Sequence, residues 1–149
     1  MDKLLFPRFA YNTIIRDEKV YIRCLLRKKY VRLTPEEWVR QHVINHLVTD
    51  LNYPAGRMRA EGKINKRTGT WQRADILLYD NAKKVHMIVE CKSVREKLSA
   101  STVQQMLRYN EAQVPLLVFT NGIVLFCFSR CHAQPRYVRH PKIPIHCDA

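Results

Sequence analysis

Three short apolar runs limit how this chain can fold more than any other feature of its sequence. Residues 74–79 (ADILLY), 86–89 (HMIV) and 116–119 (LLVF) carry mainly apolar side chains at consecutive positions. A strand built from such a run is apolar on both faces, and it therefore lies inside a sheet that is covered on both sides. The sequence predicts an α/β (α+β) fold in which helices flank a central mixed sheet.

A helix is predicted before the first of these runs. Thr34, Pro35 and Glu37 have the spacing of a capping box at a helix start. Apolar residues follow at i+4 steps and give this helix one apolar face: Val39, Val43, Leu47 and Leu51. We expect the helix to extend from Pro35 to about Asp50, where NYPAG ends it.

The remaining segments give the order helix, three strands, helix, strand, strand. Strands are expected at 57–65, 73–80, 85–92, 115–120 and 123–129, and the second helix at 101–112. A helix separates the third and fourth strands, so these two can lie parallel, while Asn121-Gly122 indicates a type I′ hairpin turn between the last two. We interpret residues 1–149 as a single domain, with a core at about 34–128, an N-terminal β-hairpin at about 11–33 and an irregular tail at about 130–149.

The composition narrows the function classes. The chain has 26 Lys and Arg against 13 Asp and Glu, a net charge of +13, which favours a polyanionic partner, with DNA the first candidate. It contains no apolar run long enough for a membrane helix and no signal peptide. Five cysteines at irregular spacing then indicate reduced thiols and a cytoplasmic protein.

Two charged residues end the run near position 90. Glu90 and Lys92 are two apart in a strand and share a face, while Cys91 points to the other. If NAKK forms a four-residue loop, Asp75 pairs with Glu90 across the hairpin. Two such carboxylates repel each other, so Lys92 would offset one charge and Mg²⁺ (or Mn²⁺) the rest, with the backbone carbonyl of Cys91 as a further ligand. A basic protein with this site is typical of a metal-dependent nuclease; the alternative is an ordinary surface ion pair.

These residues resemble a known group of enzymes. "RADILLYD" followed by "VECK" resembles the D-x(n)-E-x-K core of the PD-(D/E)XK nuclease superfamily. Together with "RKKYVRLTPEEWVRQHVINHL", "VECKS", "QQMLRYN" and "TNG", it resembles the nuclease domain at the N-terminus of type I restriction enzyme R subunits, in a short stand-alone form. The resemblance covers about residues 5–128 and implies a restriction-endonuclease-like fold of the order αβββαβ.

The resemblance also implies roles for single residues. Asp75 and Glu90 would bind the metal, Lys92 would be the catalytic lysine, and Gln105 and Tyr109 would overlook the site from the second helix. DNA would be the substrate, and restriction-modification subunits would be partners. For Gln105 and Tyr109, the alternatives are a solvated glutamine and a core aromatic residue.

Two more acids are candidates for supporting roles. Glu37 would be the first-helix carboxylate that many relatives contribute, although its capping role already explains it. Glu61 lies on the strand before Asp75 and would come close to it if the connecting loop keeps the expected length.

Basic residues form three clusters: Arg136, Arg139 and Lys142 in the tail are one, and another lies beside the candidate site. Lys63, Lys66, Arg67 and Arg73 stand next to it in sequence and are expected to contact the DNA backbone, the alternative being a solvated basic surface. Arg27, Lys28, Lys29 and Arg32 form a second basic cluster. The cysteines and histidines of residues 127–147 do not have the spacing of a common zinc finger.

Three functions stay open. The first is a Mg²⁺-dependent DNA endonuclease that works in restriction or DNA processing. The second is a binding module on the same fold that holds nucleic acid or a restriction subunit without cutting, and the third is a junction-resolving enzyme acting as a homodimer. The chain has no G-x-x-x-x-G-K-[ST] motif, so ATP-driven translocation is not implied.

Overall fold

The computed structural model describes residues 3–65, 71–108, 113–131 and 136–147. Within these ranges lie two α-helices, α1 (Pro35–Asn45) and α2 (Ala100–Arg108). The strands are β1 (Thr13–Arg16), β2 (Lys19–Arg23), β3 (Tyr30–Arg32), β4 (Met58–Asn65), β5 (Trp71–Tyr79), β6 (Val85–Cys91), β7 (Leu116–Thr120), β8 (Leu125–Arg130) and β9 (Tyr137–His140). None of the helices in this part of the chain is long and apolar enough to cross a membrane.

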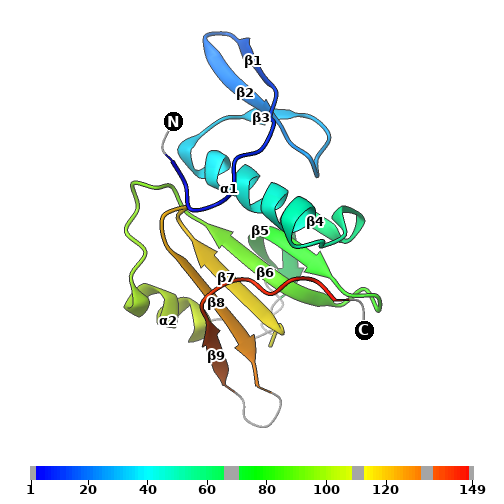
Figure 1. Cartoon of the computed structure of the whole chain (residues 1–149), viewed down its shortest axis with the longest axis vertical. Helices are drawn as coiled ribbons and strands as arrows, with labels where there is room; N and C mark the ends of the chain where they lie inside the picture. Colours follow the sequence, from blue (N-terminus) through cyan, green and yellow to red (C-terminus); the bar gives the residue numbers. More distant parts are fainter. Residues whose placement is uncertain (1–2, 66–70, 109–112, 132–135, 148–149) are drawn as a thin grey trace.

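The central sheet has the strand order β4-β5-β6-β7-β8-β9 (Figure 1). Neighbouring strands are antiparallel except β6 and β7, which run parallel with Val89 opposite Val118. The chain passes through α2 between these two strands, as a parallel connection requires. The predicted mixed sheet and its parallel pair are therefore confirmed.

Consecutive residues of the central strands pack on opposite faces of this sheet. Ile76 and Val89 belong to a buried cluster that includes the apolar side of α1. Leu77 and Ile88, one position along each strand, belong to a second cluster with Val103 of α2. The continuous apolar runs in the sequence follow from this arrangement, because each strand is covered on both sides.

Helix α1 begins where the capping residues predict. The Thr34 hydroxyl accepts a hydrogen bond from the backbone N–H of Glu37 at 3.1 Å, and Pro35 is the first helical residue. The helix does not continue regularly to Asp50, because His46–Asp50 form a π-helical turn in which the Leu51 N–H donates to the His46 carbonyl.

The hairpin between β5 and β6 differs from the prediction in its turn but not at the far end of its strands. The Asp80 N–H donates to the Lys84 carbonyl, so the loop is one residue shorter than expected, with Lys83 in a left-handed conformation (φ 61°). A bulge then follows, because Tyr79 pairs with Val85 whereas Leu78 pairs with Met87. The bulge compensates for the shorter loop, and beyond it the register is the predicted one.

The turn after β7 is not the predicted type I′ turn. Thr120 pairs with Leu125, so four residues connect the strands, and of these only Gly122 (φ 88°) has a positive φ. The Asn121 side-chain oxygen accepts from the N–H groups of Ile123 and Val124, both at 3.0 Å. The prediction was wrong because this side chain closes the turn in place of the backbone.

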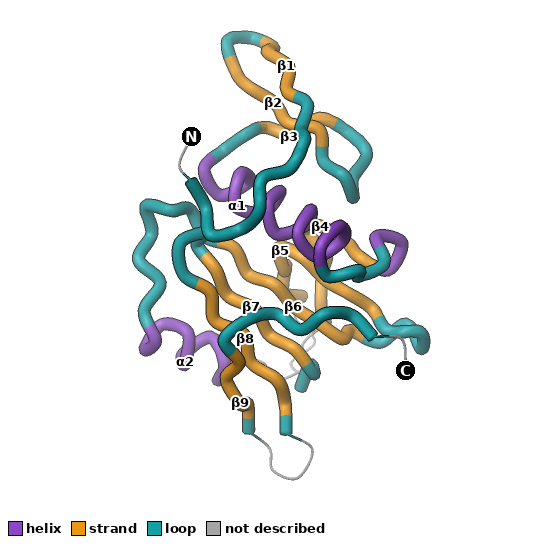
Figure 2. Tube along the Cα trace, in the orientation of Figure 1, coloured by secondary structure: helices purple, strands orange, loops and turns teal. Residues whose placement is uncertain are grey.

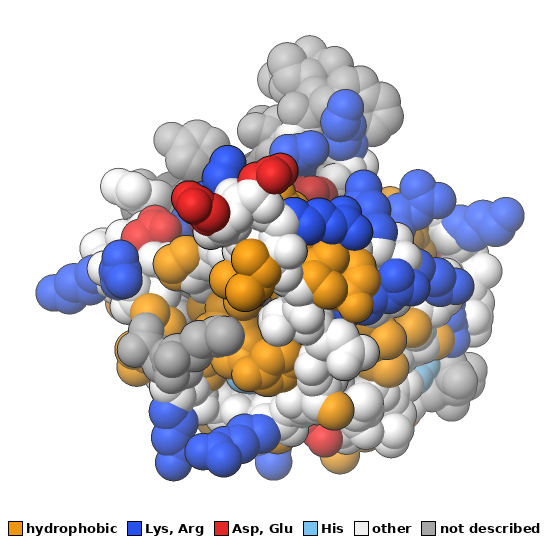
Figure 3. Space-filling view, turned by 90° about the horizontal axis from the view of Figure 1, so that it is seen from above, with side chains coloured by type: hydrophobic (Ala, Val, Ile, Leu, Met, Phe, Trp, Pro, Cys, Tyr) orange, Lys and Arg blue, Asp and Glu red, His pale blue; other side chains and the backbone are white. Residues whose placement is uncertain are grey.

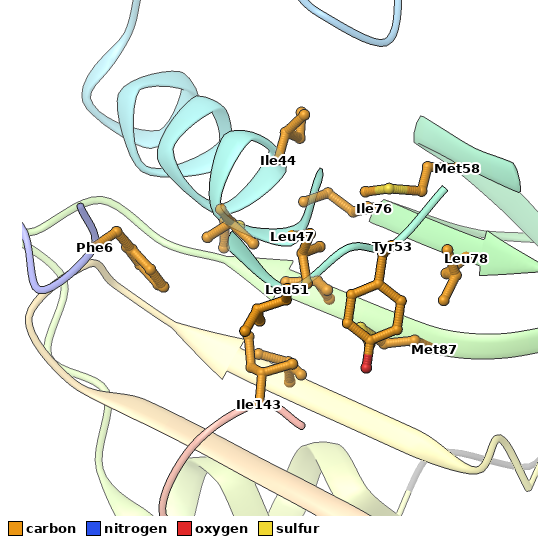
Figure 4. Packing of buried hydrophobic residues seen from close by; sticks show 14 of the residues in the cluster. Phe6, Ile44, Leu47, Leu51, Tyr53, Met58, Ile76, Leu78, Met87 and Ile143 are labelled. Atoms are coloured by element: carbon orange, nitrogen blue, oxygen red, sulfur yellow. The ribbon is translucent and has the colours of Figure 1, made fainter. Parts of the chain in front are cut away.

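Both ends of the chain contain more structure than predicted. The N-terminal segment forms a three-stranded sheet, β1-β2-β3, instead of a simple hairpin, and it stands beyond α1 from the central sheet (Figure 2). The tail is not irregular throughout, because β9 pairs with β8. Ile143 then joins the buried cluster under α1, beside Leu51 and Tyr53 (Figure 4).

Candidate acidic site between the first helix and the sheet

Three adjacent strands bring three carboxylate residues into one row. In β4 and β5, Ala60 pairs with Ile76 and Gly62 with Ala74, so Glu61 stands opposite Asp75. In β5 and β6 the last pair is Ile76 with Val89, and Asp75 and Glu90 are the next residues along. Glu61 has a left-handed backbone (φ 55°) and interrupts the pairing of β4 at this position. The structure thus brings together the three strand acids that the sequence singled out.

Both carboxylate oxygens of Asp75 are engaged. Oδ2 accepts a hydrogen bond from the backbone N–H of Cys91 at 2.7 Å, and Oδ1 accepts one from the Arg40 guanidinium at 2.6 Å. The Cys91 side chain is fully buried in the cluster under α1, together with Met87 and Val89 of the same strand, and Ile88 belongs to the cluster on the other face. By this alternation Cys91 points to the opposite face from Glu90, as predicted. The group of Cys91 that contacts Asp75 is its amide, and a role for its carbonyl stays a prediction.

Glu90 lies in an environment that favours the protonated carboxyl group. Burial raises its pKa, and the negative charge of Asp75 raises it further, to about 9, against the smaller opposing effects of Lys92 and Arg40. Lys92 is held at the sheet by its N–H, which donates to the Thr120 carbonyl at 2.9 Å. Glu90 is therefore held in its protonated form by the side chains that surround it.

Arg40 of α1 is the central residue of this site, and the sequence analysis missed it. Its side chain is only 7% exposed and forms ion pairs with Asp75 and with Glu37. The same guanidinium lies 3.3 Å from a Glu36 oxygen and 3.7 Å from a Glu61 oxygen. Burial opposes its charge, but the carboxylates of Glu37 and Asp75 outweigh burial and raise the pKa of Arg40. A sequence signal existed, since Arg40 is three and four residues after two glutamates on a helix.

Arg27 enters the site from the loop between β2 and β3. Its guanidinium bonds to Glu37 and, at 3.2 Å, to Glu61. Its Nε also donates to the Cys24 sulfur at 3.2 Å, and although burial raises the pKa of that thiol, the bonds from Arg27 lower it by more. Arg27 is thus part of the acidic site, and its side chain, which the sequence groups with Lys28 in a basic cluster, is largely buried.

The two glutamates at the start of α1 have different surroundings. Glu37 is buried and bonds to Arg27, Arg40 and, at 2.8 Å, the side-chain amide of Gln41. Glu36 is 38% exposed at its side chain and faces Asp75 and Lys92. Burial and the Asp75 charge raise the pKa of Glu36, while Arg40 and Lys92 act against them. The first-helix acid that is open to solvent is therefore Glu36, which the sequence analysis did not single out.

The other predicted site residues do not all come together. Gln105 is exposed on α2, and in the described ranges no hydrogen bond or ion pair joins it to the acids. Lys63 pairs directly with Arg73 across β4 and β5, and Arg73 lies 3.9 Å from Glu61. Tyr109, Lys66 and Arg67 lie outside the described residues. On the face seen in Figure 3, basic side chains are widespread, whereas most acidic ones gather in one part.

The donor atoms of the site suit a hard cation only in part. Asp75 and Glu90 offer adjacent carboxylate oxygens, the ligands that Mg²⁺ and Mn²⁺ prefer. However, across the residues that the structure describes, no three or more His, Cys, Asp or Glu side chains are grouped so that they could hold a metal ion. Two carboxylates are enough for a Mg²⁺ ion that keeps several of its waters, but one Asp75 oxygen is bonded to Arg40.

The fold and the site together define a mixed α+β domain with a row of strand carboxylates beside two arginines and a lysine. The chain belongs to the family described as the type I restriction enzyme R protein N terminus, whose model matches residues 35–144. No curated protein matches the chain. Among solved structures it is similar to part of a DrdV–DNA complex studied by cryoEM, with 14% identity and a TM-score of 0.45. That match covers 71% of this chain and 10% of the other.

Proposed function

We propose that this chain is a metal-dependent nuclease domain that hydrolyses DNA phosphodiester bonds, with a PD-(D/E)XK fold and a role in restriction. The observation that carries the proposal is the placement of Asp75 and Glu90 side by side on β5 and β6, with Lys92 two residues further. Membership in the restriction enzyme R protein family supports it.

Each residue of the proposed site has a chemical task. Asp75 and Glu90 would hold a divalent cation, which when bound polarises the scissile phosphate. The Lys92 amine would orient the attacking water and hold its proton. Glu36 is 38% exposed at its side chain, and its charge would help to hold the Lys92 amine in place.

Basic residues on β4 and β5, the strands that carry Glu61 and Asp75, support a substrate with regularly spaced negative charges. Lys63 and Arg73 are direct cross-strand partners, and like charges in that position repel each other. A phosphate between them would remove the repulsion. We therefore place the DNA backbone along β4 and β5, beside Glu61.

The test is plasmid digestion in Mg²⁺ or Mn²⁺. The wild-type chain should cut, and Lys92→Ala should lower the rate by roughly 100-fold or more, since a positioned proton-transfer group contributes about that much. Asp75→Asn should lower the rate as well, because it removes a charged ligand of the proposed metal. Lys84→Ala is the matched control, because Lys84 is exposed at the opposite end of the same hairpin. Cleavage that survives both site substitutions would contradict the proposal.

A second candidate is a binding module that does not cut. It is favoured by the bond from Arg40, which occupies an Asp75 oxygen that a catalytic metal would need. Under this alternative, Mn²⁺ would not raise the melting temperature through Asp75, so wild type and Asp75→Asn would show equal metal responses while both bind DNA.

A further inference from the structure

Arg40 connects more of the acidic site than any other cation in the described part of the chain. One terminal nitrogen bonds to Asp75 Oδ1 at 2.6 Å and lies 3.3 Å from Glu36 Oε1. The other bonds to Glu37. One guanidinium therefore links the glutamates of helix α1 to Asp75 of the central sheet.

The buried position of the Arg40 guanidinium is unfavourable in free energy unless its partners are charged. The Arg40 side chain is 7% exposed, and its Nε has no hydrogen-bond partner in the described part of the chain. A buried charge that loses its counter-ion destabilises a fold strongly. Arg40 is thus held by the acids, and the acids by Arg40.

Arg27 offers an internal comparison. It also carries a largely buried guanidinium, 16% exposed at the side chain, and it also bonds to Glu37 and Glu61. It has no bond to Asp75 among the interactions of the described residues. The two arginines therefore have similar charge and similar partners, and they differ in whether they occupy the oxygen that a metal would need.

We propose that Arg40 is the resident counter-cation of the acidic row: it neutralises Asp75 in the metal-free protein, and a divalent cation must displace it from Oδ1 to bind. This inference rests on the proposed function. The Arg40 nitrogen that leaves Asp75 can bond to Glu36 with little movement, because Glu36 Oε1 already lies 3.3 Å from it. When a divalent cation binds Asp75, the Arg40 guanidinium keeps Glu36 and Glu37 as partners, so α1 does not have to move. The arginine lowers metal affinity while it keeps the empty site folded.

The test measures Mn²⁺ affinity by titration calorimetry and the melting temperature with and without Mn²⁺. Arg40→Gln should bind Mn²⁺ about 10-fold more tightly than wild type, because the competing cation is gone. It should also melt lower than wild type in chelator and recover more on adding Mn²⁺. Arg27→Gln is the matched control and should change Mn²⁺ affinity less than about 3-fold, since it removes the same charge without freeing Asp75.

Four outcomes would overturn the inference. Equal affinity gains in Arg40→Gln and Arg27→Gln would show a general effect of charge, and weaker binding by Arg40→Gln would show that Arg40 supports the metal ligands. If wild type binds Mn²⁺ through Asp75 but Arg40→Gln gains nothing, the proposed function survives and this inference fails. If no variant binds Mn²⁺, both fail together.

A second variant covers the case in which Arg40→Gln does not fold. Arg40→Lys keeps the positive charge, but its compact ammonium group cannot span Glu37 and Asp75 as the guanidinium fork does. It should fold and bind Mn²⁺ more tightly than wild type. An affinity equal to that of wild type would contradict displacement at Oδ1.

Discussion

Lys63 and Arg73 face each other as direct partners on β4 and β5, one residue pair beyond Gly62 and Ala74. Like charges in this position repel each other and destabilise a sheet. The pair lies on the strands that carry Glu61 and Asp75, so this destabilising repulsion acts next to the acidic site.

Neutralising this pair should weaken DNA binding in a salt-dependent way. For Lys63→Gln and for Arg73→Gln, we expect the slope of log K against log salt to fall by about 1 each, because each variant loses one phosphate contact. The measurement is fluorescence anisotropy on a duplex at several salt concentrations. Lys84→Gln, at the exposed turn between β5 and β6, should leave the slope unchanged. Slopes that are equal in all three variants would remove this pair from the DNA interface.

Gly62 should tolerate no side chain, because β4 runs close to Leu77 at this point. A Cβ at Gly62 would lie 2.5 Å from Leu77 Cδ1, and Leu77 is fully buried with little room to move. Gly62→Ala should therefore lower the free energy of unfolding by about 1–3 kcal/mol in urea titration, the usual cost of overpacking. Gly56→Ala, which meets nothing within 4 Å, serves as control. If both variants cost the same, the close approach is not what requires glycine.

His42 should make the fold less stable in acid. Burial lowers the pKa of His42 from its ordinary value of 6.5, against a smaller opposing effect of the Trp38 carbonyl. The unfolded chain then binds a proton that the folded chain does not, so this contribution is complete above pH 6.5 and is lost as the pH falls toward the folded pKa.

The pH effect is measured by comparing unfolding free energies at pH 7.5 and 5.5 for wild type and His42→Gln. Wild type should lose more stability than the variant, because only wild type carries this buried imidazole. His86, whose pKa burial also lowers, is present in both chains and cancels. Equal losses would show that His42 does not contribute.

Much of the fold is predictable from local patterns. The apolar runs indicate strands covered on both faces, and these are the strands β5, β6 and β7. The capping residues locate the start of α1 at Pro35. The third strand of the N-terminal sheet and β9 were not predicted. A strand of three or four residues is too short to show an alternation of apolar and polar residues, and it forms only when a partner strand is beside it.

The candidate site, too, was predictable only in part. Hairpin counting places Asp75 next to Glu90 correctly, because two differences cancel: the loop is one residue shorter and β6 has one extra residue in its bulge. The correct pairing therefore depends on a shorter loop and a bulge that the sequence does not predict.

The sequence by itself determined the acids on the strands, since alternation along a strand and pairing across a hairpin are local rules. Only the tertiary structure decided which cations meet those acids. Arg40 and Arg27 come from a helix and a loop that lie far from Asp75 and Glu61 in the chain. Their positions depend on how α1 packs over Ile76 and Val89, and apolar packing depends on the shapes of both surfaces, which no local pattern contains.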